Sequence, residues 1–186
     1  DKIFFKVRNN GDAFYQSNLV HRNEMLDSLF DPLDYLIKNS KDLDLEIHAW
    51  FNSYLLWNKK HLPEDKEHYY YSCPECLESD INGKSDSKIK LNKNQSKEWE
   101  GVFLAPTHPD VNNYLLSIIN EIINKYDIDG INLDYIRYQD SFYGYNQKGV
   151  ENFINQFEVD PRDINRGLIS TRFGYSEDFL DTAIYN

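Results

Sequence analysis

The amino-acid sequence predicts an α/β fold, a partial TIM (β/α)8 barrel with parallel strands and a long inserted loop near residues 57–100. Segments with the two-residue period of strands alternate with segments of helical period, which favours parallel strands joined by right-handed crossovers. Each expected strand has one apolar face, and its other face becomes polar towards the C-terminal end. Three strand–helix units cannot close an eight-stranded barrel of about 250 residues. We therefore expect one partial barrel domain over residues 1–186, as part of a longer chain.

The first strand and the first helix are expected near the N-terminus. Residues 3–8 alternate between apolar and polar side chains, and the turn residues Asn9–Asp12 follow directly. Asp31 and Pro32 are typical of the N-cap and the first position of a helix. The apolar residues that follow them recur at helical spacing and predict a helix that ends near Asp44.

The remaining elements follow the same alternation. Residues 45–51 read as the second strand, and residues 57–100 lack a sustained period and read as a surface insertion rather than a separate domain. The clearest helix begins at Pro109, because apolar residues recur every three or four positions up to Tyr126. A third strand is expected over 131–136 and a further helix over 150–157.

The polar faces of the three strands define where chemistry is expected. In a barrel these faces point into the interior, and the active site lies at the C-terminal ends of the strands. The side chains expected on these faces are Lys6 and Arg8, His48 and Asn52, and Asn132 and Asp134.

Charge argues against nucleic acid as a partner, and hydropathy argues against a transmembrane segment. The chain has 20 Lys and Arg against 31 Asp and Glu, and a net charge of -11 repels nucleic acid. No apolar run approaches the length of a transmembrane segment, and the first residues lack the pattern of a targeting peptide. The open edges of a partial barrel would permit self-association.

The strongest motif for catalysis is the segment 126–138, in which the third strand delivers Asp134 to its C-terminal end. A carboxylate there can act as a nucleophile or stabilise an oxocarbenium-like transition state. Arg137 would keep it ionised, because a nearby positive charge favours the charged form. The alternative is a structural salt bridge between Asp134 and Arg137 at the base of a loop.

A second set of polar residues suits carbohydrate binding. His48, Trp50 and Asn52 place an imidazole, an indole and an amide on one face of the second strand, where they can bond sugar hydroxyls and stack on a sugar ring. The alternative is a buried histidine bonded to a carbonyl and a core tryptophan. Arg8 and Asp12 can add polar contacts, although Asn-Gly-Asp is equally a turn chosen for its backbone.

The two cysteines are only weak evidence for a metal-binding site. Cys73 and Cys76 have the spacing of a zinc half-site, but a second pair is missing and the spacing of His61 and His68 is not that of a zinc site. Free thiols or a local disulfide are the favoured interpretation, and we predict no metal and no cofactor. The triplet Asn94–Ser96 matches a glycosylation acceptor.

Two aromatic runs fall in expected loops. Tyr69–Tyr71 is interpreted as an anchor that holds the insertion on the barrel. Phe142–Tyr145 follows the Asp134 strand, and here lining a substrate and packing within the loop are equal alternatives.

Several of these motifs, in the same order, resemble the bacterial glycosyl-hydrolase-like family ten, a family of (β/α)8 barrels. The matching segments cover most of residues 3–160, and the most specific is the last. They are 7–15, 30–33, 45–52, 104–111 and 126–138.

The resemblance implies a glycosidase that acts on polysaccharide, in some members on the glycan strands of peptidoglycan in the cell envelope, and an exported protein. It implies that Asp134 is the catalytic carboxylate and that His48, Trp50, Asn52 and Arg137 line the pocket. Gln139 departs from the proline usual in the family. The full set of expected substrate-binding residues is Arg8, Asp12, His48, Trp50, Asn52, Asn132, Tyr135, Arg137 and Tyr138.

Glycoside hydrolysis needs a second carboxylate. Asp12 is one candidate, and Glu177 and Asp178 lie in a tail that the resemblance does not cover. We expect the second carboxylate to lie outside these 186 residues, so the isolated chain is expected to be inactive. The alternative function is a carbohydrate-binding or scaffold protein that keeps the sugar cleft without turnover.

Overall fold

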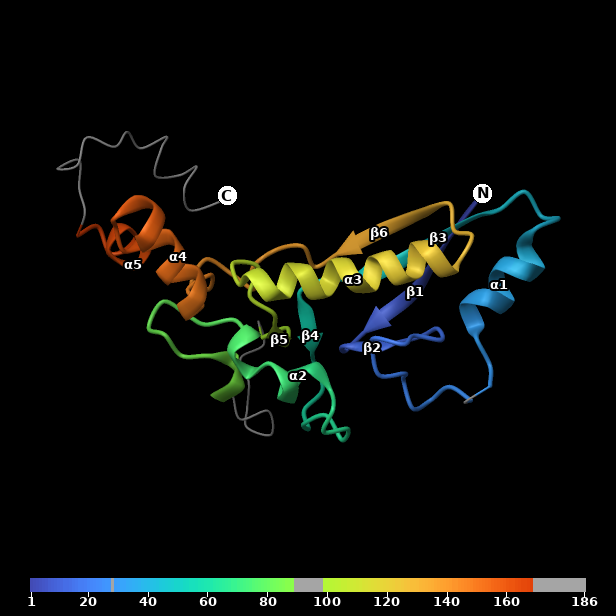
Figure 1. The fold of residues 1–186 in the computed structure, drawn as a ribbon, viewed down its shortest axis with the longest axis horizontal. Coiled ribbons are helices and arrows are strands. Elements are labelled where there is room, and N and C mark those ends of the chain that lie inside the picture. The colour runs from blue at the N-terminus through green and yellow to red at the C-terminus, as the bar shows by residue number, and fades with distance from the viewer. Residues whose placement is uncertain (28, 89–98, 169–186) are drawn as a thin grey trace.

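The computed structural model describes residues 1–27, 29–88 and 99–168, and its centre is a four-stranded sheet. The order of strands is β2 (Asp12–Ala13), β1 (Lys2–Asn9), β3 (Glu46–Asn52) and β6 (Gly130–Asp134) (Figure 1). Strands β1, β3 and β6 are parallel, and β2 pairs antiparallel with the end of β1. The fold is therefore α/β with a mixed sheet, and the parallel order of the three predicted strands is confirmed.

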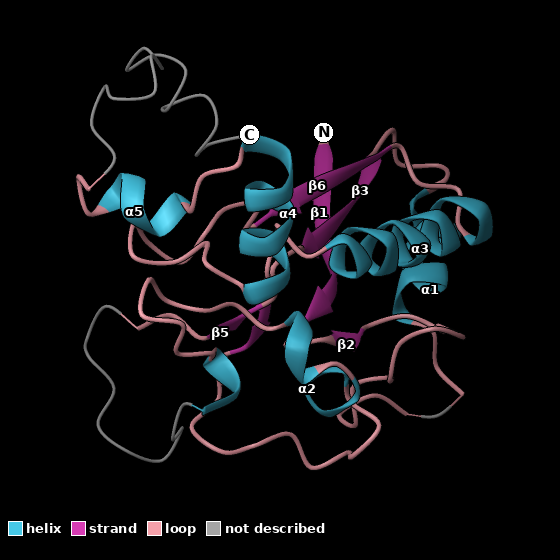
Figure 2. Cartoon of the chain, turned by 60° about the vertical axis from the view of Figure 1, so that its left-hand side comes forward, coloured by secondary structure: helices cyan, strands magenta, loops and turns pink. Residues whose placement is uncertain are grey.

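Two helices cover one face of this sheet. Helix α1 (Pro32–Ser40) connects β1 to β3, and α3 (Pro109–Lys125) precedes β6; Figure 2 shows both on the same side of the strands. Their buried apolar residues form one core with alternate residues of β3, since burying this apolar surface is the main force that holds the layers together. The core residues of these three elements are Leu33, Ile37, Ile47, Ala49, Phe51, Val111, Leu115, Ile118 and Ile122.

The ends of these elements follow local sequence signals. Asp31 caps α1 by accepting from the backbone N–H groups of Leu33 and Asp34, as its sequence predicts. Helix α1 ends at Ser40, earlier than expected. Strand β6 ends at Asp134 and not at residue 136, because Tyr135 adopts a left-handed backbone conformation with φ of 54° that breaks the extended chain.

A bulge in β1 changes which side chains share a face. Lys6 pairs with Trp50 and Arg8 pairs with Phe51, so Val7 is an extra residue with no partner of its own. An extra residue in one strand shifts the alternation of faces. Arg8 therefore lies on the helix-covered face with Phe51, and the expectation that it shares a face with Lys6 is wrong.

The described part of the expected insertion is folded. Strands β4 (Leu55–Trp57) and β5 (Val102–Phe103) form a separate antiparallel pair, and α2 (Tyr69–Ser72) and two short 3-10 helices at Pro74–Cys76 and Asp86–Lys88 lie between them. Their buried side chains join the core of the sheet. The interpretation of this segment as a surface loop is therefore wrong in part, because its aromatic residues bury enough apolar surface to order it.

Two helices follow β6, namely α4 (Gln147–Phe157) and α5 (Pro161–Asn165). They lie at the opposite end of the molecule from α1 (Figure 1). Helix α4 contains the predicted segment 150–157 and begins three residues earlier, after the N-cap Asn146. In the described part of the chain, no helix combines the length and the apolar character needed to cross a membrane.

Candidate active site

Asp134 lies at the C-terminal end of β6, on the sheet face opposite the helices. We call the side chains of Lys6, Trp50, Asn52, Asn132 and Asp134 on this face the polar sheet face. One oxygen of Asp134 accepts from the indole Nε1 of Trp50 at 2.9 Å, and the other accepts from the backbone N–H of Tyr135 at 2.8 Å. The left-handed conformation of Tyr135 points this N–H at the carboxylate. Two donors from two strands thus fix the orientation of the carboxylate.

Trp50 and Lys6 lie beside this carboxylate. The ammonium of Lys6 lies 4.0 Å from the centre of the Trp50 ring, and both side chains are half-buried. Asn132 is the register partner of Trp50 on β6 and is exposed. Trp50 is therefore not a core residue, and the face combines an aromatic ring, an ammonium, an amide and a carboxylate.

Asn52 is the register partner of Asp134 and is almost fully buried. Its Nδ2 donates to the side-chain oxygen of Asn9 at 3.0 Å. Within the described residues, Oδ1 of Asn52 accepts no hydrogen bond. Asn9 was missed in the sequence because it reads equally well as the first residue of the turn.

Arg8 supports this end of the sheet from the opposite face. It is fully buried, and its guanidinium donates to the backbone carbonyls of Asn52 and, at 3.0 Å, of Ser53. Burial lowers the pKa of Arg8 below its usual value, although nearby tyrosines oppose this. Since Arg8 has no solvent-accessible surface, it positions the end of β3 and does not face a ligand.

Arg137 does not pair with Asp134. Its guanidinium forms a salt bridge with Glu100 at 2.5 Å and lies over the rings of Tyr135 and Phe103. Both proposed roles for an Asp134–Arg137 pair, electrostatic and structural, are therefore not supported by the geometry. Glu100 is far from Arg137 in sequence, so local spacing gave no signal for this pair.

His48 lies away from the carboxylate, and Tyr138 packs within the loop that follows β6. His48 is four residues before Asn52 on β3, about 13 Å along the strand, and its Nε2 lies 2.9 Å from the carboxylate of Glu46. The ring of Tyr138 packs so closely on Gly144 that a Cβ there would lie 3.2 Å from it, and burial raises the pKa of Tyr138. Of the expected residues, those that meet around Asp134 are Trp50, Asn52, Asn132 and Tyr135.

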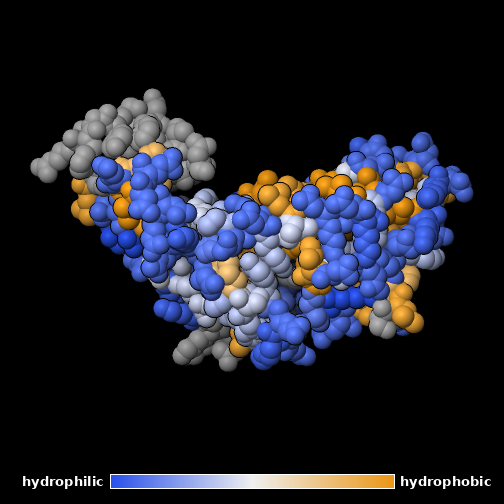
Figure 3. All heavy atoms as spheres, viewed as in Figure 1, coloured by the Kyte–Doolittle hydropathy of each residue, from blue (hydrophilic) through white to orange (hydrophobic). Residues whose placement is uncertain are grey.

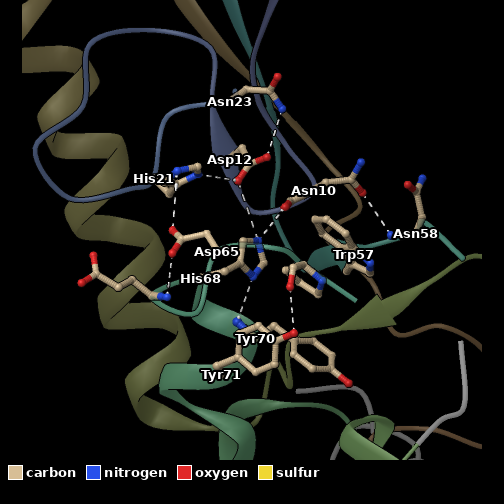
Figure 4. Close-up of polar contacts among 12 residues, drawn as sticks. Asn10, Asp12, His21, Asn23, Trp57, Asn58, Asp65, His68, Tyr70 and Tyr71 are labelled. Atoms are coloured by element: carbon tan, nitrogen blue, oxygen red, sulfur yellow. Dashed lines mark hydrogen bonds and ion pairs between the residues drawn. The ribbon is translucent and has the colours of Figure 1, made fainter. Parts of the chain in front are cut away.

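Asp12 lines a different cavity at the same end of the sheet. This pocket has a volume of about 140 Å³. It is shown in part in Figure 4, and its lining residues are Asp12, His21, Glu24, Trp57, Lys59, His61, Pro63, Glu64, Asp65 and His68. Sequence reasoning missed it because its walls come from two loops about 40 residues apart.

The cysteines and the tyrosine run have structural roles. Cys73 and Cys76 form a disulfide, and no three potential ligands among His, Cys, Asp and Glu converge on a metal position in the described part of the chain. Tyr69 stacks on Tyr114 of α3 with ring centres 3.7 Å apart, which confirms that this run anchors the insertion. The acceptor Asn94–Ser96 and the tail residues Glu177 and Asp178 lie outside the described residues.

In the aromatic run after β6, the two ends differ. Phe142 is exposed, whereas Tyr145 is buried. Packing within the loop therefore accounts for Tyr145.

The chain is similar in sequence to proteins that are named glycosyl hydrolases. It is 21% identical to glycosyl hydrolase DigH of Escherichia coli over 160 residues, covering 75% of this chain and 31% of that one. It is 26% identical to glycosyl hydrolase YngK of Bacillus subtilis over 155 residues, covering 80% of this chain and 26% of that one. The chain thus spans less than a third of the length of these relatives.

A solved structure shows the same fold. The α-L-fucosidase isoenzyme 2 from Paenibacillus thiaminolyticus superposes with a TM-score of 0.63 over 99% of this chain and 23% of that chain, at 18% identity. The family model that matches residues 1–164 is described as glycosyl hydrolase-like 10. The expected family is thereby confirmed, and the chain belongs to the glycosyl hydrolase-like 10 family.

Proposed function

We propose that this chain is part of a glycosidase barrel that cleaves polysaccharide, with Asp134 as its catalytic carboxylate. The observation that carries the proposal is the position of Asp134, at the end of a parallel strand and bonded to Trp50 and to the backbone of Tyr135. Barrel enzymes place their catalytic groups at this end of their strands.

The arrangement suits glycoside hydrolysis chemically. A carboxylate bonded by two N–H donors is held in one orientation, and it can attack a sugar carbon or stabilise a developing oxocarbenium ion. Trp50 offers an aromatic ring for a sugar, while Asn132 offers an exposed amide for sugar hydroxyls. The polysaccharides proposed as substrates include the glycan strands of peptidoglycan.

The exposed apolar side chains favour a partial barrel that further strands complete. Phe4 lies on the same face as Trp50 but at the other end of the sheet, and half of its surface is exposed. Figure 3 shows apolar side chains along the upper edge of the molecule. Among the large apolar residues of β6 and α3, Leu133 and Ile123 are exposed. Additional strand–helix units would pair with β6 and bury these residues.

The test is the release of new reducing ends from a panel of polysaccharides, including peptidoglycan without its peptides, by the full-length protein that contains this chain. We expect Asp134→Asn to lower the rate at least ~10³-fold, because an amide cannot attack or carry the negative charge. The matched control is Asp127→Asn, an exposed residue at the other end of β6, which should keep the parental rate. Equal rates for the two variants would refute the assignment.

A second candidate function is carbohydrate binding without turnover. Asp134 is the one acidic residue among the five that define the polar sheet face, whereas hydrolysis needs two carboxylates. A parent protein that binds oligosaccharide but releases no reducing ends from any substrate would favour this candidate.

A further inference from the structure

The pocket lined by Asp12, Trp57 and Asp65 contains acidic groups that the proposed reaction does not use. It lies between the loop that follows β2 and the loop that follows β4. Its volume of about 140 Å³ is close to the ~150 Å³ of a protein cavity that holds one benzene ring. A group the size of a bare six-membered ring therefore fits, and the exocyclic groups of a bound sugar would extend beyond the cavity.

The buried histidine of the pocket, His68, is neutral. His68 is buried, its Nε2 lies 2.8 Å from the carbonyl of Asn10, and its Nδ1 accepts from the backbone N–H of Tyr70. An accepting Nδ1 requires the neutral ring, and burial also lowers the pKa of His68. His21 lies between Asp12 and Asp65, at 3.4 Å and 3.5 Å (Figure 4).

The carboxylates of the pocket outnumber its cations. Four carboxylates line it, and two of them, Glu24 and Glu64, are exposed and form no ion pair within the described residues. The Lys59 ammonium lies 5.0 Å from the centre of the Trp57 ring and is not within ion-pair distance of any described carboxylate. Even with His21 protonated, the pocket keeps a negative surplus, which favours a positively charged ligand.

The contacts of Asp12 and Asp65 fix two of these carboxylates. Asp12 is nine-tenths buried and accepts from the side-chain amide of Asn23 at 3.0 Å. Asp65 accepts from the backbone N–H of Glu67 with Oδ1, while its Oδ2 accepts no hydrogen bond from any described residue. The oxygens of these two residues are thus held in place beside the cavity.

The same hairpin connects the pocket to the polar sheet face. Asn9 bonds Asn52, the register partner of Asp134, and Asp12 lies three residues later at the pocket. The pocket and Asp134 therefore lie at the same end of the sheet.

We propose that this pocket binds a sugar unit that carries a protonated primary amine, as in a glucosamine residue without its acetyl group. The acidic groups recognise the ammonium, while Trp57 and Pro63 form the apolar wall for the ring. This proposal depends on the proposed function in one respect, namely that the ligand is a sugar. An acetylated amine has no charge and would lose this attraction.

Binding of glucosamine, measured by the NMR signals of the Trp57 indole and the His21 ring in the full-length protein, tests the proposal. We expect saturable shifts with glucosamine and at least tenfold weaker binding of N-acetylglucosamine and of ethanolamine. The triple variant Glu24→Gln, Glu64→Gln, Asp65→Asn should weaken glucosamine binding at least tenfold. Each amide keeps the shape of the carboxylate, and the amide oxygen introduced by Asp65→Asn can still accept from the backbone N–H of Glu67.

Two controls separate this proposal from the proposed function. Glu151→Gln with Glu158→Gln removes two exposed charges of the C-terminal region and should leave binding unchanged. Asp134→Asn should also leave glucosamine binding unchanged, because Asp134 does not line the pocket. Equal binding of N-acetylglucosamine, or full binding by the triple variant, would overturn the amine site, whatever the hydrolysis assay gives. Equal binding of ethanolamine would overturn the assignment to a sugar.

Discussion

Single residues in this chain are placed by partners far away in sequence. Asp134 takes its orientation from Trp50, and Arg8 holds the end of β3 from inside the core. Two other acidic residues, Glu78 and Asp86, are buried in the folded insertion, and each has one carboxylate oxygen without a hydrogen bond among the described residues. Such groups have no access to water, so their protonation is linked to folding.

The pH dependence of stability follows from these two acids. Burial raises the pKa of Glu78 to about 8 and that of Asp86 to about 7. The folded state then binds more protons than the unfolded state between pH 5 and pH 8, so this contribution to stability falls as the pH rises. In Glu78→Gln the free energy of unfolding should therefore fall less steeply with pH than in the parent. The difference in slope is up to about 1.4 kcal/mol per pH unit.

Urea unfolding at pH 5, 6.5 and 8 measures this effect in the parent and in Glu78→Gln. The exposed residue Glu75 provides the control, since Glu75→Gln should leave the pH dependence as in the parent. An identical slope in Glu78→Gln and the parent would show that Glu78 does not bind the extra proton.

Elements with long sequence patterns were predicted best. The predicted start of α3 at Pro109 is correct. Eight apolar positions at helical spacing follow this proline, and such a pattern fits a helix and not a strand. Strands β2, β4 and β5 have two or three residues each and were missed, since their pairing depends on partners distant in the chain.

The candidate site was predicted in part for the same reason. The position of Asp134 at a strand end follows from local alternation, whereas the partner of Arg137 is a residue of the insertion. The bulge at Val7 has no signal in the alternation of residues 3–8, so the face of Arg8 was assigned wrongly.

Helix α1 offers a test at the level of an element. Asp31 caps the helix with one oxygen, and its other oxygen accepts from the hydroxyl of Tyr126 and the backbone N–H of Gln16. Asp31→Ala should therefore cost about 2–4 kcal/mol of unfolding free energy, the sum of a lost cap and lost half-buried hydrogen bonds.

The control for this variant is Asp34→Ala on the same helix. Among the described residues, the side chain of Asp34 forms an exposed ion pair with Lys38, which is worth about 0.3–0.5 kcal/mol. Chemical denaturation of both variants gives the comparison. A loss below 1 kcal/mol in Asp31→Ala would mean that Asp31 does not connect α1 to Tyr126 in solution.

The whole molecule has one covered and one open sheet face, and β6 pairs only with β3 among the described residues. If further strands complete the barrel, the amide groups of β6 that point away from β3 bond to the next strand in the full-length protein. Hydrogen exchange should then show these amides as protected as those that point to β3. Exchange at the rate of an exposed edge would contradict the partial barrel.

The central claim is that Asp134 performs chemistry and does not merely hold substrate. The most direct measurement combines oligosaccharide affinity and turnover on the same Asp134→Asn protein in its full-length form. We predict a dissociation constant within about threefold of the parent and a kcat at least ~10³-fold lower, because the carboxylate acts chiefly in the transition state. A variant that keeps the parental kcat and loses only affinity would contradict the account.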